Sequence, residues 1–223
     1  MRSKLNILEL FAGSCSFSNT FNNYDNTFTV DWEQHGKIDL VKDINLLGVS
    51  DVPFLPDVIW SSPDCTTYSI AAVSKHRNKD YTGKSEKAKQ SDKLVKHVID
   101  LIKQWQDLNA NLIYFIENPR GMLRKMPFMQ EFNRSTIWYC QYGDDRAKPT
   151  DIWSNSNTWK PRPECFNGNV NCHHEKAPRG SKTGTQGIKG AYNRSKIPVE
   201  LCLEVKEAVI KELFLHTEQR SLF

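Results

Sequence analysis

The sequence predicts an α/β protein with a doubly wound, mostly parallel sheet and a small irregular lobe. Short apolar segments alternate with segments whose apolar residues recur at helical spacing, the pattern of parallel strands joined by helices. An acidic residue ends the second apolar segment about 20 residues after a loop of small residues, a spacing typical of nucleotide-binding βαβ units. The periodicity is lost over residues 154–192, where we expect the lobe.

The first two predicted strands carry features of a nucleotide site. Residues 5–11 (LNILELF) are apolar, stop at the small residues AGSCS and continue as a predicted helix from residue 17. A second strand, residues 28–33 (FTVDWE), contains Asp31 and Trp32 near its end. Small residues let the backbone approach a ligand, a carboxylate accepts ribose hydroxyls, and an indole offers a stacking surface. Together they suit an adenosine-containing cofactor.

The remaining elements continue the alternation of strands and helices. Two strands are predicted at residues 57–64 and 111–119, with a helix between them at 91–105. A later strand pair at 135–143 and 151–156 suits an antiparallel arrangement, and a terminal helix follows at 197–214. The first of these strands leads to Cys65, and the second contains Glu117. Ligands collect at the carboxyl ends of parallel strands, so we expect this thiol and this carboxyl group at one edge of the sheet.

Composition limits the class of protein. The 223 residues suffice for one α/β domain with an appended lobe, and a net charge of +4 permits a polyanionic partner without requiring one. Mean hydropathy is −0.58, and the lack of an apolar run of about 18 residues excludes a membrane span. Met1 leads almost directly into an apolar strand, with no room for a signal peptide, so we expect a cytoplasmic, reducing location. The six cysteines then suit buried thiols, metal ligands or a nucleophile.

Five segments, in this order, resemble the C5-cytosine DNA methyltransferases: ILELFAGSCSFS, VDWE, KDI, DVIWSSPDCTTYS and YFIENPRGML. YGDDRAKPTDIW and the last helix are weaker matches, and the whole is similar to the short, phage-type members. The resemblance implies a Rossmann-like class I methyltransferase domain over residues 1–153 and 193–223, with a target-recognition lobe at 154–192. It also implies S-adenosylmethionine-dependent methylation of cytosine in duplex DNA, by a monomer in the cytoplasm of a bacterial or phage-infected cell.

The resemblance also implies a set of cofactor contacts at the ends of the first strands. They are Phe11, Ala12, Gly13, Ser14, Ser16, Asp31, Trp32, Asp43, Ile44 and Ser62. Ser14, Cys15 and Ser16 stand where the family has glycine or small apolar residues, which leaves cofactor affinity less well predicted than the fold.

The chemistry of cytosine methylation explains the residues at the third and fourth strand ends. Carbon C5 is a poor nucleophile, and a thiolate that adds at C6, here Cys65, turns the ring into an enamine. Negative charge then moves toward N3 and O2, so a protonated Glu117 at N3 and a cation at O2 would stabilise the adduct. Arg146 and Lys148 are both candidates for that cation, because the family's Gln-x-Arg-x-Arg pattern is reduced here to RAK. The target base must leave the duplex for attack.

Two features near Cys65 leave alternatives open. Asp64 stands beside the nucleophile, where a carboxylate would raise the thiol pKa unless it faces away or binds a cation. Residues 74–93 contain seven basic and three acidic residues and are either a solvated face or a loop that closes over a phosphate backbone, which we favour. The same chemistry on RNA such as tRNA, and a non-catalytic nucleic-acid-binding or cofactor-binding relative, are the alternative functions.

The predicted lobe contains a candidate metal site. Cys165, Cys172, His173 and His174 lie in a stretch with few apolar residues, which a structural zinc ion would stabilise. If a metal binds, Cys165, Cys172 and one of the two histidines are its ligands, with His173 as the first choice. The C-x6-C-H spacing is not the close CxxC pair of common zinc ribbons, and a fourth ligand is not fixed. These two points favour the alternative, polar loop residues without a metal.

Overall fold

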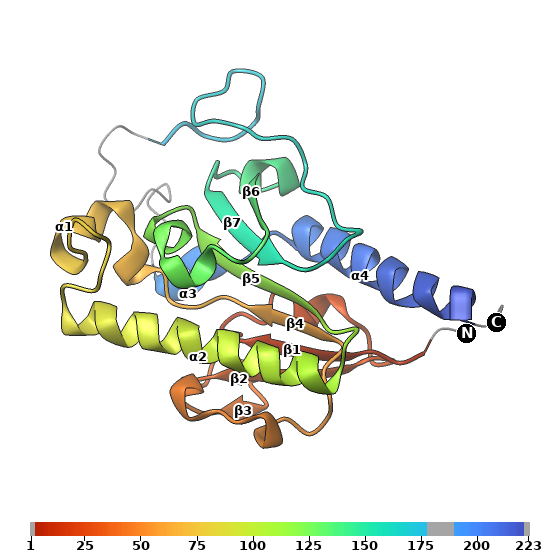
Figure 1. The fold of residues 1–223 in the computed structure, drawn as a ribbon. Helices are drawn as coiled ribbons and strands as arrows, with labels where there is room; N and C mark the ends of the chain where they lie inside the picture. Colours follow the sequence, from red (N-terminus) through yellow and green to blue (C-terminus); the bar gives the residue numbers. More distant parts are fainter. Residues whose placement is uncertain (1–2, 178–189, 221–223) are drawn as a thin grey trace.

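A seven-stranded sheet forms the centre of the computed structural model, which describes residues 3–177 and 190–220 (Figure 1). The strands are β1 (Asn6–Leu10), β2 (Asn26–Asp31), β3 (Leu40–Val41), β4 (Val58–Ser61), β5 (Ile113–Pro119), β6 (Arg134–Trp138) and β7 (Pro149–Ser154). Their order is β3-β2-β1-β4-β5-β7-β6, with β7 antiparallel to both of its neighbours and the other pairs parallel. The first five follow the Rossmann order. The predicted α/β class with a doubly wound, mostly parallel Rossmann-like sheet is confirmed, as is the antiparallel pair near the end of the chain.

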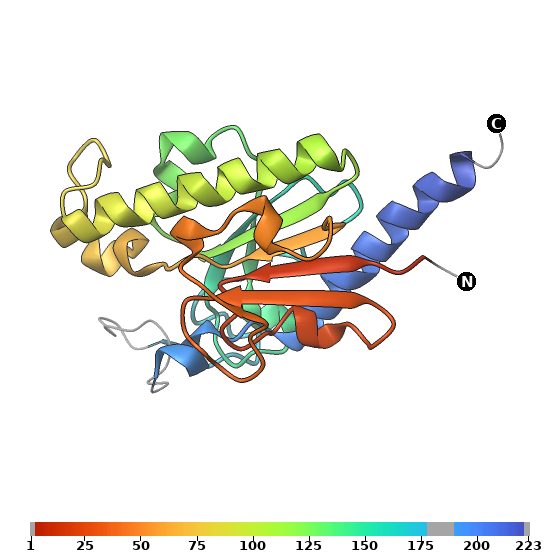
Figure 2. The same cartoon turned by 90° about the horizontal axis from the view of Figure 1, so that it is seen from below.

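Helices cover both faces of the sheet, as expected of a doubly wound fold (Figures 1 and 2). The α-helices are α1 (Val73–His76), α2 (Glu86–Leu108), α3 (Ala191–Ser195) and α4 (Val199–Arg220). The short 3-10 helices are η1 (Ser18–Thr20), η2 (Ile44–Leu46), η3 (Val49–Asp51), η4 (Thr66–Tyr68), η5 (Ile70–Ala72), η6 (Met122–Lys125), η7 (Pro127–Met129) and η8 (Tyr139–Tyr142). None of the described helices combines the length and the apolar character that a membrane crossing would need.

The buried strands alternate between two apolar cores. On β5, Tyr114 and Ile116 pack in the core beneath α2, whereas Ile113 and Phe115 pack in the core beneath α4. Successive side chains of a strand point to opposite faces, so a strand buried on both faces is apolar at nearly every position. The continuous apolar runs in the sequence therefore correspond to central strands.

The connection between β1 and β2 differs from the prediction. The expected helix from residue 17 is reduced to the three residues of η1. The C-terminal helix α4 packs there instead, where Phe17 and Phe21 share a core with Leu201 and Val205 of that helix. The face that a crossover helix would cover is thus buried by a segment from the other end of the chain, and no local sequence pattern could indicate this.

Candidate active site

A cleft of about 510 Å³ lies at the carboxyl edge of the sheet. Its walls come from the loops after β1, β4 and β5, from the segment that leads into β7, and from α3. Cys65, Glu117 and Lys148 all line it. A thiol, a carboxyl group and an ammonium group from three separate segments therefore share one cavity.

Cys65 lies in the loop after β4 and immediately precedes η4. Asn118 holds this loop, because its Nδ2 donates a 2.8 Å hydrogen bond to the carbonyl oxygen of Pro63. Burial, followed by the carboxyl groups of Glu117 and Asp64, raises the pKa of the Cys65 thiol to about 11. Lys148 acts in the opposite direction. The thiol is thus neutral in the free protein at neutral pH, with one cation that favours its ionised form.

Asp64 is oriented by its own turn. Its Oδ1 accepts hydrogen bonds from the backbone N–H and the hydroxyl of Thr66, the former at 3.0 Å. Lys87 Nζ lies 3.8 Å from the other carboxylate oxygen, at the protein surface. Asp64 therefore caps a turn and interacts with a cation, and it contributes less to the pKa of Cys65 than burial and Glu117 do.

Glu117 is buried near the end of β5. The hydroxyl of Tyr139 donates a 3.0 Å hydrogen bond to Glu117 Oε1, which fixes the carboxyl group from the side of η8. The following turn packs closely on η4, since a side chain at Gly121 would collide with the backbone carbonyl of Tyr68. Tyr139 and Asn118 were not identified from the sequence, because their roles depend on contacts between distant segments.

The two candidate cations occupy different environments. Arg146 is buried and forms a bidentate ion pair with Asp144. The hydrogen bonds that Arg146 donates to Asp144 raise the pKa of the guanidinium group. Lys148 lines the cleft, and its Nζ donates to the carbonyl oxygen of Arg194 at 3.2 Å and lies 4.4 Å from the Tyr139 ring centre. Burial lowers the pKa of Lys148, and interaction with Glu117 partly offsets this. Of the two candidates, Lys148 is therefore the one that lines the cleft and can contact a ligand there.

The loop after β1 has an unusual backbone. Phe11 and Cys15 have φ angles of 56° and 53°, in the left-handed region that non-glycine residues rarely adopt. Glu9 supports the loop, since its carboxylate accepts hydrogen bonds from the backbone N–H groups of Phe17 and Ser18. Burial raises the pKa of Glu9 to about 6. Strained backbone of this kind often occurs at ligand sites.

The expected cofactor contacts fall into two groups. Phe11, Ala12, Ser14, Ser16 and Ser62 line the cleft. The others lie outside its lining: Gly13 donates its N–H to Asp31 Oδ2 at 2.9 Å, Trp32 is 69% exposed, Asp43 caps η2, and Ile44 is 2% exposed in the core beneath α2. The hydrogen bond from Gly13 therefore joins Asp31 to the loop that lines the cleft, whereas the Ile44 side chain serves packing.

The basic segment after Cys65 divides into exposed and buried cations. Its six lysines are exposed. Arg77 is buried, and its NH1 lies 2.7 Å from Asp92 Oδ2 while Nε donates to the carbonyl oxygen of Thr67. Arg77 is one of the seven basic residues of the segment 74–93 that we expected to contact phosphate, and for this residue the expectation is wrong. Its side chain fastens the segment after Cys65 to α2, because a buried guanidinium requires charged and polar partners.

The lobe and η8 together bring three thiols and one imidazole close to one another. The donor atoms of Cys140, Cys165, Cys172 and His174 all lie within 4.8 Å of one another. His173 is not in this group, and its Nε2 lies 3.1 Å from the carbonyl oxygen of Asp144. The first choice of histidine is thus corrected to His174. Cys140, which immediately follows Tyr139, was not identified as a potential ligand because it is far from the others in the sequence.

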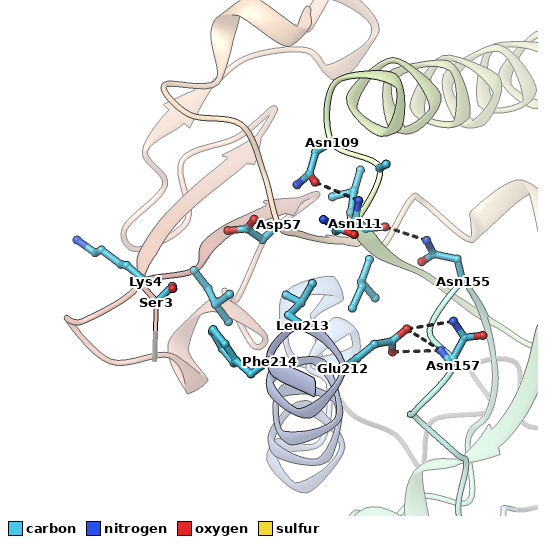
Figure 3. Close-up of a pocket in the computed structure, with 14 residues that line it drawn as sticks. Ser3, Lys4, Asp57, Asn109, Asn111, Asn155, Asn157, Glu212, Leu213 and Phe214 are labelled. Carbon is cyan, nitrogen blue, oxygen red and sulfur yellow. Dashed lines mark hydrogen bonds between the residues drawn. The ribbon is translucent and has the colours of Figure 1, made fainter. Parts of the chain in front are cut away.

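A second hollow, of about 350 Å³, lies at the opposite, amino edge of the sheet (Figure 3). Asp57, Asn109, Asn155 and Glu212 line it, but their polar atoms bind the surrounding backbone. Asp57 accepts from the N–H of Asn6 at 2.8 Å, and Asn155 Oδ1 accepts from the N–H of Tyr114 at 2.9 Å. The polar groups at this edge hold chain segments together.

No protein-family model and no curated protein matches the sequence. Three solved structures are similar to part of this chain. A DNA modification methyltransferase encoded within an E. coli prophage is 13% identical over 74% of this chain, with a TM-score of 0.48. The Entamoeba histolytica methyltransferase EhMeth is 14% identical over 74% of this chain, with a TM-score of 0.49. The S. pombe Dnmt2 methyltransferase is 17% identical over 72% of this chain, with a TM-score of 0.47. This chain covers 53%, 58% and 53% of those three chains, little more than half of their length.

Proposed function

We propose that this protein is an S-adenosylmethionine-dependent DNA methyltransferase of the C5-cytosine family, which acts through a covalent bond between Cys65 and carbon C6 of a flipped cytosine. The observation that carries the proposal is the shared cleft of Cys65, Glu117 and Lys148. A nucleophile, an acid and a cation are the three groups that this reaction requires.

Each of the three side chains has a defined task. The Cys65 thiol loses its proton to solvent and attacks C6 as the thiolate, and the electron pair of the C5–C6 bond becomes available at C5 while charge develops toward N3 and O2. Glu117 donates a proton at N3, and because Tyr139 bonds Oε1, Oε2 is the oxygen left for that contact. Lys148 stabilises charge at O2. After methylation of C5, a base such as water takes the C5 proton, the Cys65 thiolate leaves, and the N3 proton returns to Glu117, which restores the aromatic ring.

The cofactor would bind at the side of the cleft formed by the end of β1 and the loop that follows it. When bound, S-adenosylmethionine supplies an electrophilic methyl group on a sulfonium. The Trp32 ring is 69% exposed, and it would stack on adenine. The carboxylate of Asp31 would accept hydrogen bonds from the ribose hydroxyls. The small residues Ala12, Ser14 and Ser16 leave room for the rest of the molecule. Serines at these positions are compatible with the loop, since Ser14 and Ser16 hydrogen-bond each other at 2.7 Å.

We propose duplex DNA as the substrate. The exposed lysines of the segment that follows Cys65 can bind phosphates around a flipped base. The lobe at residues 154–192 is proposed as the target-recognition region. Residues 178–189 of that region lie outside the described residues.

A trapping experiment tests the proposal without knowledge of the target sequence. DNA synthesised entirely with 5-fluorocytosine cannot lose its C5 substituent as a proton, so the enzyme with S-adenosylmethionine should stall as an adduct that survives denaturation. Peptide mass spectrometry should locate the adduct at Cys65, and Cys65→Ala should form none. Radiolabelled methyl transfer to ordinary duplex DNA and to tRNA is measured in parallel.

Each outcome has one meaning. An adduct at Cys15 or Cys140 would show that the wrong thiol has been assigned. Transfer of label to tRNA alone would make RNA the substrate. No transfer to either polymer, with cofactor binding intact, would identify a non-catalytic relative.

A further inference from the structure

The lobe cluster has the composition of a zinc site. Three cysteines and one histidine, Cys140, Cys165, Cys172 and His174, present donor atoms that all lie within 4.8 Å of one another. In a tetrahedral site with Zn–S bonds of about 2.3 Å, neighbouring ligand atoms are about 3.8 Å apart. His174 Nδ1 already lies 3.9 Å from Cys165 Sγ. Contraction by about 1 Å at most would convert the cluster into a tetrahedral site.

The environment suits thiolate ligands. Cys140, Cys165 and His174 are buried and Cys172 is half-buried. Amide groups donate toward the sulfur atoms: Asn169 Nδ2 lies 3.5 Å from Cys165 Sγ, and Gln141 Nε2 lies 3.8 Å from Cys172 Sγ. Such donors stabilise metal-bound sulfur. Four protein ligands leave no open position, so the site is structural rather than catalytic.

The alternative is a small apolar core. Trp138, Cys140, Ala147 and Cys165 form a buried cluster with Cys172 against it. A core of this size provides little apolar area for a segment that has neither strand nor helix between residues 155 and 177. A disulfide would pair two of the three thiols and leave the third and His174 without a function. A single zinc ion uses all four groups.

We propose that Cys140, Cys165, Cys172 and His174 bind one structural Zn²⁺ ion that fastens the lobe to the end of β6. Cys140 is the ligand from the sheet domain, in η8, and the other three come from the lobe. The ion is therefore a bridge between the two parts of the chain. Gly168 N–H now donates to His174 Nε2 at 3.1 Å, and this bond is given up when Nδ1 binds the metal and Nε2 carries the proton.

The bridge also bears on the proposed active site, and this step rests on the proposed function. The N–H of Glu175 donates to the carbonyl oxygen of Asp145 at 3.0 Å, and residue 175 forms an isolated bridge with Arg146. Tyr139, which binds Glu117, directly precedes Cys140. Zinc thus positions the chain from Tyr139 to Lys148, which contributes the cation and the partner of the acid.

Metal analysis of the full chain, purified without a histidine tag, tests the site. We expect one equivalent of zinc. Replacement by Co²⁺ should produce thiolate-to-metal charge transfer and the intense visible bands of a tetrahedral sulfur-rich site. Chelation should increase proteolysis within residues 155–177 at least tenfold while the strands stay protected, because the sheet has its own core.

Matched variants identify the ligands. His174→Asn and Cys140→Ser should lose zinc, while the adjacent His173→Asn and the distant Cys15→Ser should keep it. Less than about half an equivalent in the wild-type protein, or zinc lost from His173→Asn and kept by His174→Asn, would overturn the proposal. If Cys140→Ser does not fold, the wild-type cobalt spectrum decides whether three thiolates bind. Zinc content is measured without any methyl-transfer assay, so the site and the proposed function can fail independently.

Discussion

The two edges of the sheet both have a hollow lined by polar groups, yet they use these groups in opposite ways. At the amino edge, Glu212 accepts hydrogen bonds from Ser156, Asn157 and Thr158, which together outweigh burial and lower its pKa. Figure 3 shows those from Asn157. At the carboxyl edge, burial raises the pKa of Cys65 and lowers that of Lys148, so both charged forms are disfavoured. A charge that is fully satisfied stabilises a fold, whereas one that is incompletely satisfied is available for chemistry.

The largest expected effect is the loss of activity in Cys65→Ala. The thiol forms the covalent bond in the proposed reaction, so methyl transfer should fall by about 10⁴-fold or more. The free energy of unfolding should change by less than about 1 kcal/mol, because no buried hydrogen bond is lost. Radiolabel transfer and urea unfolding measure the two quantities. Turnover close to that of the wild type would exclude the mechanism.

The opposite result is expected at the amino edge for Glu212→Gln. The amide cannot replace a carboxylate that accepts from several donors, so the free energy of unfolding should fall by about 2 kcal/mol at pH 7 with methyl transfer retained. Because the folded pKa of Glu212 is lowered, its contribution is present above the unfolded value of 4.5 and is lost as the pH falls through the folded value. The difference between variant and wild type should therefore shrink below pH 4.5.

Glu207→Gln, on the exposed surface of the same helix, is the control for this measurement. This variant should leave the free energy of unfolding unchanged, both at pH 7 and below pH 4.5. A destabilisation as large as that of Glu212→Gln would show that the loss of helix charge, and not the hydrogen bonds at the amino edge, is responsible.

Within one short segment, Lys148 and Arg146 should show the same division, with loss of activity at Lys148 and loss of stability at Arg146. Lys148→Met should slow methyl transfer about 10²-fold with little change in stability, and Lys148→Arg should restore most of the rate. Arg146→Gln leaves Asp144 without its cation and should lower the free energy of unfolding by about 3 kcal/mol. Steady-state kinetics and urea unfolding on all three variants check this. Equal rate losses in Lys148→Met and Lys148→Arg would exclude a role for the positive charge.

A smaller effect is expected at Asp64, which raises the pKa of Cys65. Asp64→Asn should lower this pKa from about 11 and increase alkylation of Cys65 by iodoacetamide several-fold at pH 8. In both proteins the rate should rise about tenfold for each pH unit below the thiol pKa, since only the thiolate reacts. Peptide mass spectrometry reports Cys65 alone. An unchanged rate would mean that solvent screens Asp64 completely.

The smallest effect is expected on the surface beside the carboxyl edge. Neutralising Lys75 and Lys79 should flatten the dependence of DNA affinity on salt, by a slope of about 0.9 for each phosphate that the protein no longer binds. Lys211→Gln, near the amino edge, should leave the slope unchanged. Arg77→Gln should instead destabilise the protein, because Asp92 would lose its buried partner. Identical slopes in the Lys75 and Lys79 double variant and the wild type would indicate an ordinary solvated face.

Much of the site could be predicted because it depends on local pattern. The apolar runs that became β1, β4 and β5 are visible in the sequence, and strands that run parallel bring their carboxyl ends together. Cys65 and Glu117 are each tied to the end of one such strand. Their presence in one cleft is therefore a consequence of strand order and direction.

What the sequence determined by itself is the class of the sheet and the chemical type of the groups at its carboxyl edge, because periodicity and strand ends are properties of neighbouring residues. Only the tertiary structure decided which of two residues with the same chemistry lies in the cleft or in the metal-ligand cluster. Lys148 and Arg146 are two residues apart, yet one lines the cleft and the other is paired with Asp144. Cys140 joins the lobe cysteines, and His174 replaces His173, because contacts across the fold bring their donor atoms together. Burial and partners are set by segments distant in the chain, and they decide the charge and reactivity of each side chain.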